Sequence, residues 1–313
     1  QVYADGMRRL LDRIAELPAT AIPMVPTLLD YRNVELTPGN SPARKRELLG
    51  NVATLGYYGT WLREEALARG LPLVDQAAGF NRFLRSIRQT DPHYMLAPDA
   101  IHPNPAGLWV MAHTLIETLE TNRFISTVDI FPRQGRVEGR ATGGTLSQVE
   151  RDQEVIRFTF RAESLPWVPP PEVDADSNSS AAFAARHLNS GAALSRERLR
   201  LLALASNVYE LKIDGTAVGR FDHVQLADGI DLQDHPRNPA YRQARAVAEL
   251  NAEKTRGPMF RLGVEYERVS ARGTAADEKA VAACEAEIRR YEERIYAVNQ
   301  PVPHTYELAP VPP

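Results

Sequence analysis

The chain has 313 residues, a formal net charge of −3 and a hydrophobic content of 43%. That length can form one large domain or two ordinary ones. The sequence shows no clustered basic face of the kind typical of nucleic-acid-binding proteins, and no run approaches the roughly 18 apolar residues of a membrane span. The single cysteine, Cys284, excludes an intrachain disulfide. No ligand spacing is typical of a metal site, so we expect neither a metal nor a cofactor.

The first 120 residues alternate between helical and strand patterns. Helical periodicity predicts helices at 3–17, 43–69, 79–88 and 106–119, and short apolar runs predict buried strands at 21–29 and 71–76. Gly70 is expected to end the long helix, and Asp75 to cap the segment that follows the second strand. This order is typical of a parallel α/β sheet, although two strands are fewer than such a sheet normally has.

The pattern changes after residue 122, where apolar residues alternate with polar ones and glycine turns recur. We expect residues 122–225 to be mostly β, interrupted by a helical piece near 179–204. Asp214-Gly215 lies between two β-prone runs, which predicts a hairpin.

The last part of the chain is predicted to be helical. Charge and apolar patterns favour helices at 239–254 and 275–298, followed by an extended proline-rich tail. The sequence therefore predicts a division into 1–121, 122–235 and 236–313.

One stretch, PDAIHPNPAG at 98–107, combines an Asp, a His and a proline-rich turn directly before an apolar helix. The prolines restrict φ and limit the freedom of the loop. A neutral imidazole needs a partner on one nitrogen to hold a single tautomer, and Asp99 lies near enough to His102 to provide it. The pair then predicts a general base and its orienting carboxylate, serving a nucleophilic hydroxyl or thiol. The alternative is a turn without chemistry, with Asn104 as a helix cap.

This stretch resembles the last conserved block of the SGNH (GDSL-like) hydrolases, in which Asp-x-x-His is followed by Pro-Asn and a Gly. Asp99 and His102 match the Asp and the His, and 103–107 match the turn. The resemblance covers roughly residues 1–120, and 205–310 is similar to the tail of some bacterial members. It implies a flavodoxin-like, three-layer α/β fold without its N-terminal strands, followed by a β-rich module and C-terminal helices. It also implies a Ser-His-Asp triad that cleaves an ester, with an acetylated carbohydrate as one candidate.

The chain departs from that family where the nucleophile is concerned. Neither the Gly-Asp-Ser block nor the glycine and Gly-x-Asn-Asp blocks of the oxyanion hole occur in it. Three explanations remain open: residues before Gln1 carry the serine, a second chain supplies it, or the pair is a relic. Two functions follow. The first is an SGNH-type ester hydrolase that uses His102 and Asp99, and the second is a non-catalytic binding or scaffold protein with a degenerate hydrolase domain.

The expected partner is a small-molecule or carbohydrate ester, without nucleic acid and without a membrane span. An apolar strand at 21–29 with an unpaired edge invites pairing between chains, so a homo-oligomer is one expected state. The compartment stays open. A single cysteine fits a cytosolic protein, and a secreted or periplasmic location in a bacterium fits as well, with no signal peptide in the chain.

Overall fold

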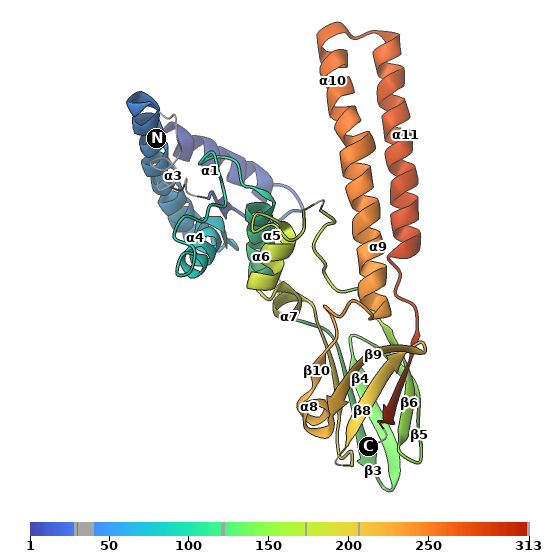
Figure 1. The fold of residues 1–313 in the computed structure, drawn as a ribbon. Coiled ribbons are helices and arrows are strands. Elements are labelled where there is room, and N and C mark those ends of the chain that lie inside the picture. Colours follow the sequence, from blue (N-terminus) through green and yellow to red (C-terminus); the bar gives the residue numbers. More distant parts are fainter. Residues whose placement is uncertain (28–29, 31–40, 120–122, 173, 206, 312–313) are drawn as a thin grey trace. The chain divides into compact units, whose positions relative to one another are not determined.

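The computed structural model describes residues 1–27, 30, 41–119, 123–172, 174–205 and 207–311. These residues form a mixed α/β structure with three separate sheets (Figure 1). Contacts divide the chain into unit 1, residues 1–121 and 172–190, and unit 2, residues 122–171 and 191–313. The sequence-based division assigns 172–190 to the β module and 236–313 to an extension of its own. In the structure residues 172–190 group with unit 1, and residues 236–313 group with the strands of unit 2.

Unit 1 is built from helices beside a short parallel sheet. Its helices are α1 (Val2–Ala15), α3 (Pro42–Arg69), α4 (Gln76–Ile87), α5 (Pro105–Leu119) and α6 (Ala181–His187), and its strands are β1 (Met24–Val25) and β2 (Val74–Asp75). The two strands pair in parallel, as the alternation of elements predicts. They are the only strands among the described residues of unit 1, so these residues do not form the three-layer sheet that the resemblance implies. Residues 28–29 of the predicted strand lie outside the described part.

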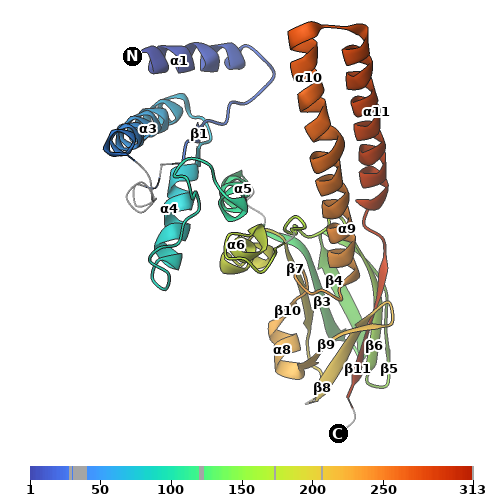
Figure 2. The same cartoon turned by 45° about the horizontal axis from the view of Figure 1, so that its top comes forward.

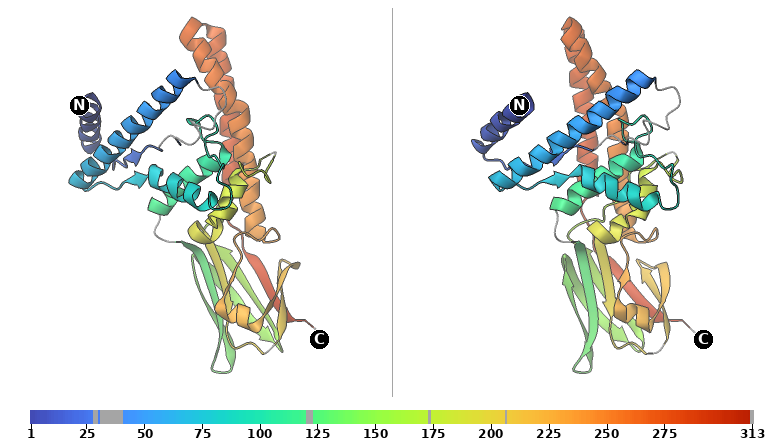
Figure 3. Two further views of the ribbon diagram at one scale, coloured as in Figure 1. Left: turned by 60° about the vertical axis from the view of Figure 1, so that its left-hand side comes forward. Right: turned by 90° about the vertical axis from the view of Figure 1, so that its left-hand side faces the viewer.

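The long helix α3 begins and ends at residues whose chemistry fixes both ends. Ser41 accepts a hydrogen bond from the N–H of Arg44 at 3.2 Å, and Pro42 occupies the first helical position. Gly70 ends the helix with φ of +65°, a conformation that glycine adopts without a Cβ clash. Between these caps α3 runs as one straight rod (Figure 3).

The core of unit 1 lies where α4 packs against α5. The buried large side chains of α4 recur at helical spacing: Phe80, Phe83, Leu84 and Ile87. On α5, Trp109 and Val110 are buried. The loop that joins the two helices is therefore anchored at both ends in packed side chains.

Unit 2 contains two sheets that share one core. The order of the first is β10 (Ile230–Asp231), β7 (Arg196–Leu201), β3 (Phe124–Arg133) and β4 (Arg136–Thr142). The order of the second is β5 (Gly144–Asp152), β6 (Val155–Ala162), β11 (His304–Pro310), β8 (Val208–Ile213) and β9 (Thr216–Asp222). Buried side chains of both sheets, among them Ile130 and Leu199 from the first and Phe158 and Leu211 from the second, form one cluster. The arrangement is a two-layer sandwich.

The predicted hairpin at Asp214-Gly215 is confirmed, whereas two other segments of unit 2 differ from the prediction. Both turn residues have positive φ, 50° and 74°, as a two-residue hairpin turn requires. The helical piece near 179–204 stops with α7 (Ser190–Leu194), and β7 follows it. The proline-rich tail is not free but forms strand β11, paired with β6 and β8.

The helices of unit 2 include α8 (His223–Asp228) and a long hairpin. α9 (Pro239–Lys254) continues through the π-helical turn η1 (Thr255–Met259) into α10 (Phe260–Arg272), and α11 (Ala275–Val298) runs back beside it (Figure 2). The helices predicted at 239–254 and 275–298 are confirmed. Pro258 lacks an N–H and lies in η1, which accounts for the irregular turn. Among the described residues, none of the helices combines the length and apolar character needed to span a bilayer.

Candidate functional site

Asp99 and His102 meet on the loop that precedes α5. His102 Nδ1 lies 2.6 Å from Asp99 Oδ2, the short distance of a charge-assisted hydrogen bond. The other carboxylate oxygen, Oδ1, accepts the backbone N–H groups of Ile101 at 2.9 Å and of His102 at 2.7 Å. One carboxylate thus fixes both the turn and the imidazole, which is the pairing that the three-residue spacing predicts.

These contacts keep Asp99 ionised and leave the imidazole of His102 accessible to solvent. The hydrogen bond from the His102 ring, followed by those from the backbone N–H groups of His102 and Ile101, holds the pKa of Asp99 well below its usual range. The side chain of His102 is 81% exposed and that of Asp99 is 55% exposed. With Nδ1 donating to Asp99, Nε2 carries the free lone pair, and no described residue bonds to it.

The backbone between the two side chains is strained. Ala100 has φ of +69°, a region that non-glycine residues rarely adopt. Its side chain is buried together with Leu48 of α3. Packing therefore holds the turn in a conformation that an isolated peptide would avoid, and strain of this kind is typical of functional sites.

Asn104 ties the loop to the start of α5. Its Oδ1 accepts the N–H of Gly107 at 2.9 Å, and its Nδ2 donates to the carbonyl of Met95 at 3.1 Å. Pro105 occupies the first helical position, where its missing N–H costs nothing. A Cβ on Gly107 would lie 2.9 Å from the Leu96 carbonyl oxygen, so only glycine lets the helix pass this close to the loop. The predicted cap role of Asn104 is confirmed.

Two other polar residues of unit 1 have structural roles. Asp75 accepts the N–H of Ala78 at 2.9 Å and so caps α4, as predicted, and it also pairs with Arg63 at 2.8 Å. His113, on α5, is buried with its Nδ1 2.9 Å from Ser190 Oγ.

The structure does not bring a described serine to His102. Ser86 Oγ lies 3.0 Å from Nε2 of His187, and Ser190 bonds to His113. Sequence reasoning gave no role to Ser190, because its partners on α5 lie 77 and 81 residues away and leave no local pattern. The described residues also contain no group of three or more His, Cys, Asp or Glu side chains that could hold a metal ion.

Comparisons with known proteins identify the fold. No protein-family model matches the chain, and no curated protein matches it in sequence. The chain is similar to a solved structure described as BT4096, a gut microbial diltiazem-metabolizing enzyme. The TM-score is 0.74 at 22% sequence identity, and the match covers 98% of this chain and 76% of that chain. At this identity the likeness establishes a shared fold.

These findings overturn the assignment to the SGNH family. No family model matches the chain, and the structural likeness spans both units rather than residues 1–120 alone. The physical reason lies in the block itself. The three hydrogen bonds that the Asp99 carboxylate accepts join residues at most three positions apart, so chains of different origin can form this turn. The block predicts the Asp–His geometry correctly without identifying a family.

Proposed function

We propose that this protein is a hydrolase of small-molecule esters in which His102 is the general base and Asp99 its orienting carboxylate. The observation that carries the proposal is the 2.6 Å contact between His102 Nδ1 and Asp99 Oδ2 on an exposed loop. The full-length likeness to BT4096, a diltiazem-metabolizing enzyme, supports a small-molecule substrate.

The geometry fits general-base chemistry. Asp99 accepts the Nδ1 proton and thereby holds the tautomer in which Nε2 can take a proton. In the proposed reaction His102 Nε2 removes the proton of a serine hydroxyl, and the serine oxygen attacks the carbonyl carbon of the ester. The proton then passes to the departing alkoxide, and water releases the acyl group in a second step. Acetyl esters of small molecules or carbohydrates are the proposed substrate class.

The test measures hydrolysis of p-nitrophenyl acetate, of diltiazem (itself an acetate ester) and of an acetylated sugar. His102→Ala is expected to lower kcat/KM by roughly 10²–10⁴-fold, the usual contribution of a general base. Asp99→Asn is expected to lower kcat, because the amide no longer stabilises the imidazolium that forms. A fluorophosphonate probe and peptide mapping on the native protein then locate the serine.

The matched control is His93→Ala, which removes another exposed histidine of the same loop. Its activity should equal that of the wild type. Because the Asp99–His102 pair is exposed, the unfolding temperatures of all three variants should stay close to the wild-type value. Equal hydrolysis by His102→Ala and wild type would exclude the proposed base, and absence of hydrolysis would favour a binding function.

A further inference from the structure

Two neighbouring residues outside the loop that carries the Asp99–His102 pair each accept a hydrogen bond from one end of that loop. Tyr94 Oη donates to the carbonyl of Asn178 at 2.7 Å, and the N–H of Ala106 donates to the carbonyl of Ser179 at 2.8 Å. Tyr94 precedes the pair and Ala106 follows it. The two acceptors are neighbours in residues 172–190. This segment lies between β6 and β7 in the sequence but belongs to unit 1. We call residues 172–190 the return segment.

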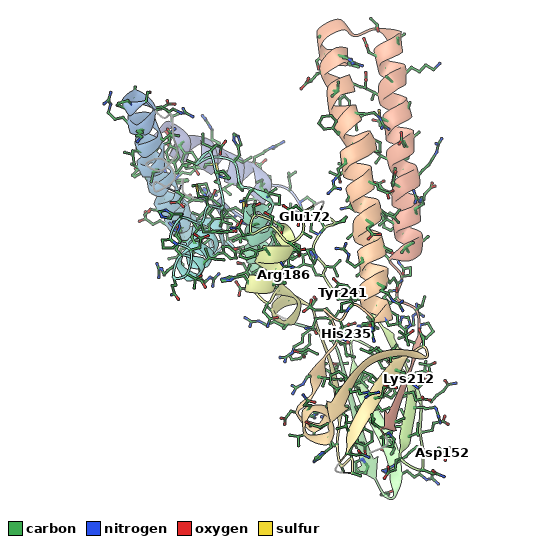
Figure 4. The ribbon with its side chains drawn as sticks, viewed as in Figure 1. Asp152, Glu172, Arg186, Lys212, His235 and Tyr241 are labelled. Atoms are coloured by element: carbon green, nitrogen blue, oxygen red, sulfur yellow. The ribbon has the colours of Figure 1, made fainter. Side chains whose placement is uncertain are left out.

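The return segment holds these two carbonyls firmly. Ser180 caps α6 by accepting the N–H of Phe183 at 2.9 Å, and its hydroxyl donates to the carbonyl of Ala175 at 2.8 Å. The Glu172 carboxylate, beside the start of α6 (Figure 4), accepts the N–H groups of Ala181 and Ala182 at 3.0 and 3.2 Å. The first backbone N–H groups of α6, which have no acceptor within the helix, therefore find acceptors within the segment.

A buried hydrogen-bond group fixes the far end of the return segment. Ser190 Oγ accepts from Trp109 Nε1 at 3.0 Å and lies 2.9 Å from His113 Nδ1. All three side chains are buried, and both partners belong to α5, the helix that begins directly after the loop. The C-terminal end of the return segment is thus attached to α5. The centre of the segment is attached to both ends of the loop.

Tyr94 is the most specific of these attachments. Its side chain is 4% exposed, and its ring lies 6.0 Å from that of Phe83 and 5.9 Å from that of Phe183. Burial raises the pKa of its hydroxyl, so the group stays a proton donor. The ring is held by packing and the hydroxyl by one carbonyl, so removal of the oxygen alone leaves the packing in place.

We propose that the return segment positions the Asp99–His102 pair, and that Tyr94, through the Asn178 carbonyl, is its main positioning residue. The kinetic part of this inference rests on the proposed function, whereas the geometric part does not. The pair is exposed, so its mutual hydrogen bond alone cannot hold the loop against solvent. A displacement of about 1 Å at a reacting group can cost on the order of 10²-fold in rate.

The experiment compares Tyr94→Phe with Tyr57→Phe in the full chain. Tyr57 is a 67% exposed tyrosine of α3 and serves as the matched control. The first readout is the tautomer of His102, followed in multiple-bond ¹⁵N–¹H NMR spectra and assigned with His102→Ala. The second is the division of the effect between kcat and KM for p-nitrophenyl acetate. Tyr94→Phe should mix the two tautomers and lower kcat about 3- to 30-fold with KM unchanged, and Tyr57→Phe should change neither.

The two readouts separate this inference from the proposed function. If the wild type does not hydrolyse esters but Tyr94→Phe still mixes the His102 tautomers, the positioning role stands and the hydrolase proposal fails. If the wild type hydrolyses esters and Tyr94→Phe leaves tautomer and kcat unchanged, the positioning role is overturned. Equal loss of activity in both tyrosine variants would also overturn it, since a general loss of stability would then be the cause.

Discussion

Glu197 brings a carboxyl group into the interior of unit 2. It lies on β7, is 6% exposed, and its Oε2 accepts from Asn238 Nδ2 at 2.9 Å. Burial, partly opposed by that hydrogen bond and reinforced by the charge of Asp234, raises its pKa to about 7. The folded chain therefore keeps a proton there that the unfolded chain releases near pH 4.5.

This raised pKa predicts a stability that falls as the pH rises. The folded state binds the Glu197 proton more tightly than the unfolded state. The stability gained from this proton is therefore complete below about pH 4.5 and is lost as the pH rises through about 7. We expect the free energy of unfolding to drop on the order of 1–3 kcal/mol across this window from Glu197 alone. Glu197→Gln should flatten the dependence and stabilise the protein at pH 8, as measured by denaturant unfolding.

The control for this prediction is Glu150→Gln, which changes an exposed carboxyl group on β5. It should leave the pH dependence as in the wild type. A Glu197→Gln protein that loses stability between pH 5 and pH 8 as steeply as the wild type would contradict the prediction.

At the residue scale, the sequence predicted what is local. Asp99, His102 and Asn104 act within a few positions of one another, so their spacing was sufficient. Glu197 escaped notice because its segment was predicted to be helical, and a buried carboxyl group is recognisable only once the strand is known. Tyr94 escaped notice because its acceptor lies 84 residues away.

At the element scale, α4 and α5 pack at a point where no Cβ fits. A Cβ on Gly79 of α4 would lie 1.9 Å from Thr114 Oγ1 of α5. Gly79→Ala should therefore destabilise the protein by about 1–3 kcal/mol, even though alanine favours the helix by ~1 kcal/mol. Thr114→Ala in the same chain removes the closest atom and should restore part of the loss. Thermal unfolding of the single and double variants measures both effects.

Gly56 of α3 provides the opposite case. A Cβ there meets nothing within 4 Å. Gly56→Ala should raise stability by ~1 kcal/mol through helix propensity alone. If Gly79→Ala also raised stability, α4 and α5 could not approach each other as closely at Gly79 as the structure shows.

Periodicity predicted the long helices well, because their apolar residues recur at helical spacing over many turns. It failed at β7, a run of only six residues in which arginine takes every second position and the buried positions hold Glu197, Leu199 and Leu201. Arginine and leucine also favour helices, so propensity and period disagreed there. The tertiary contacts with β3 and β10 decide in favour of the strand.

At the scale of the whole molecule, the segment predicted as a tail completes the larger sheet of unit 2. β11 lies between β6 and β8, and Leu308 on it is fully buried. Leu308→Ala should lower the free energy of unfolding by about 2–5 kcal/mol. Val302→Ala, at a 49% exposed position of the same tail, should change it by less than about 0.5 kcal/mol. Equal, small effects in denaturant unfolding would show that the tail does not stabilise the sheet.

The position of β11 also sets the order in which the protein can fold during synthesis. Arg157 on β6 pairs with Glu307 on β11, 150 residues later. At about 5–20 residues per second, a ribosome needs roughly 8–30 s to add that stretch. Until β11 is made, β6 and then β8 lack the strand that lies between them, and unit 1 is incomplete until residue 190 has been added. Unit 2 thus has unpaired strand edges for some seconds during synthesis, and chaperone binding can protect such edges from aggregation in that period.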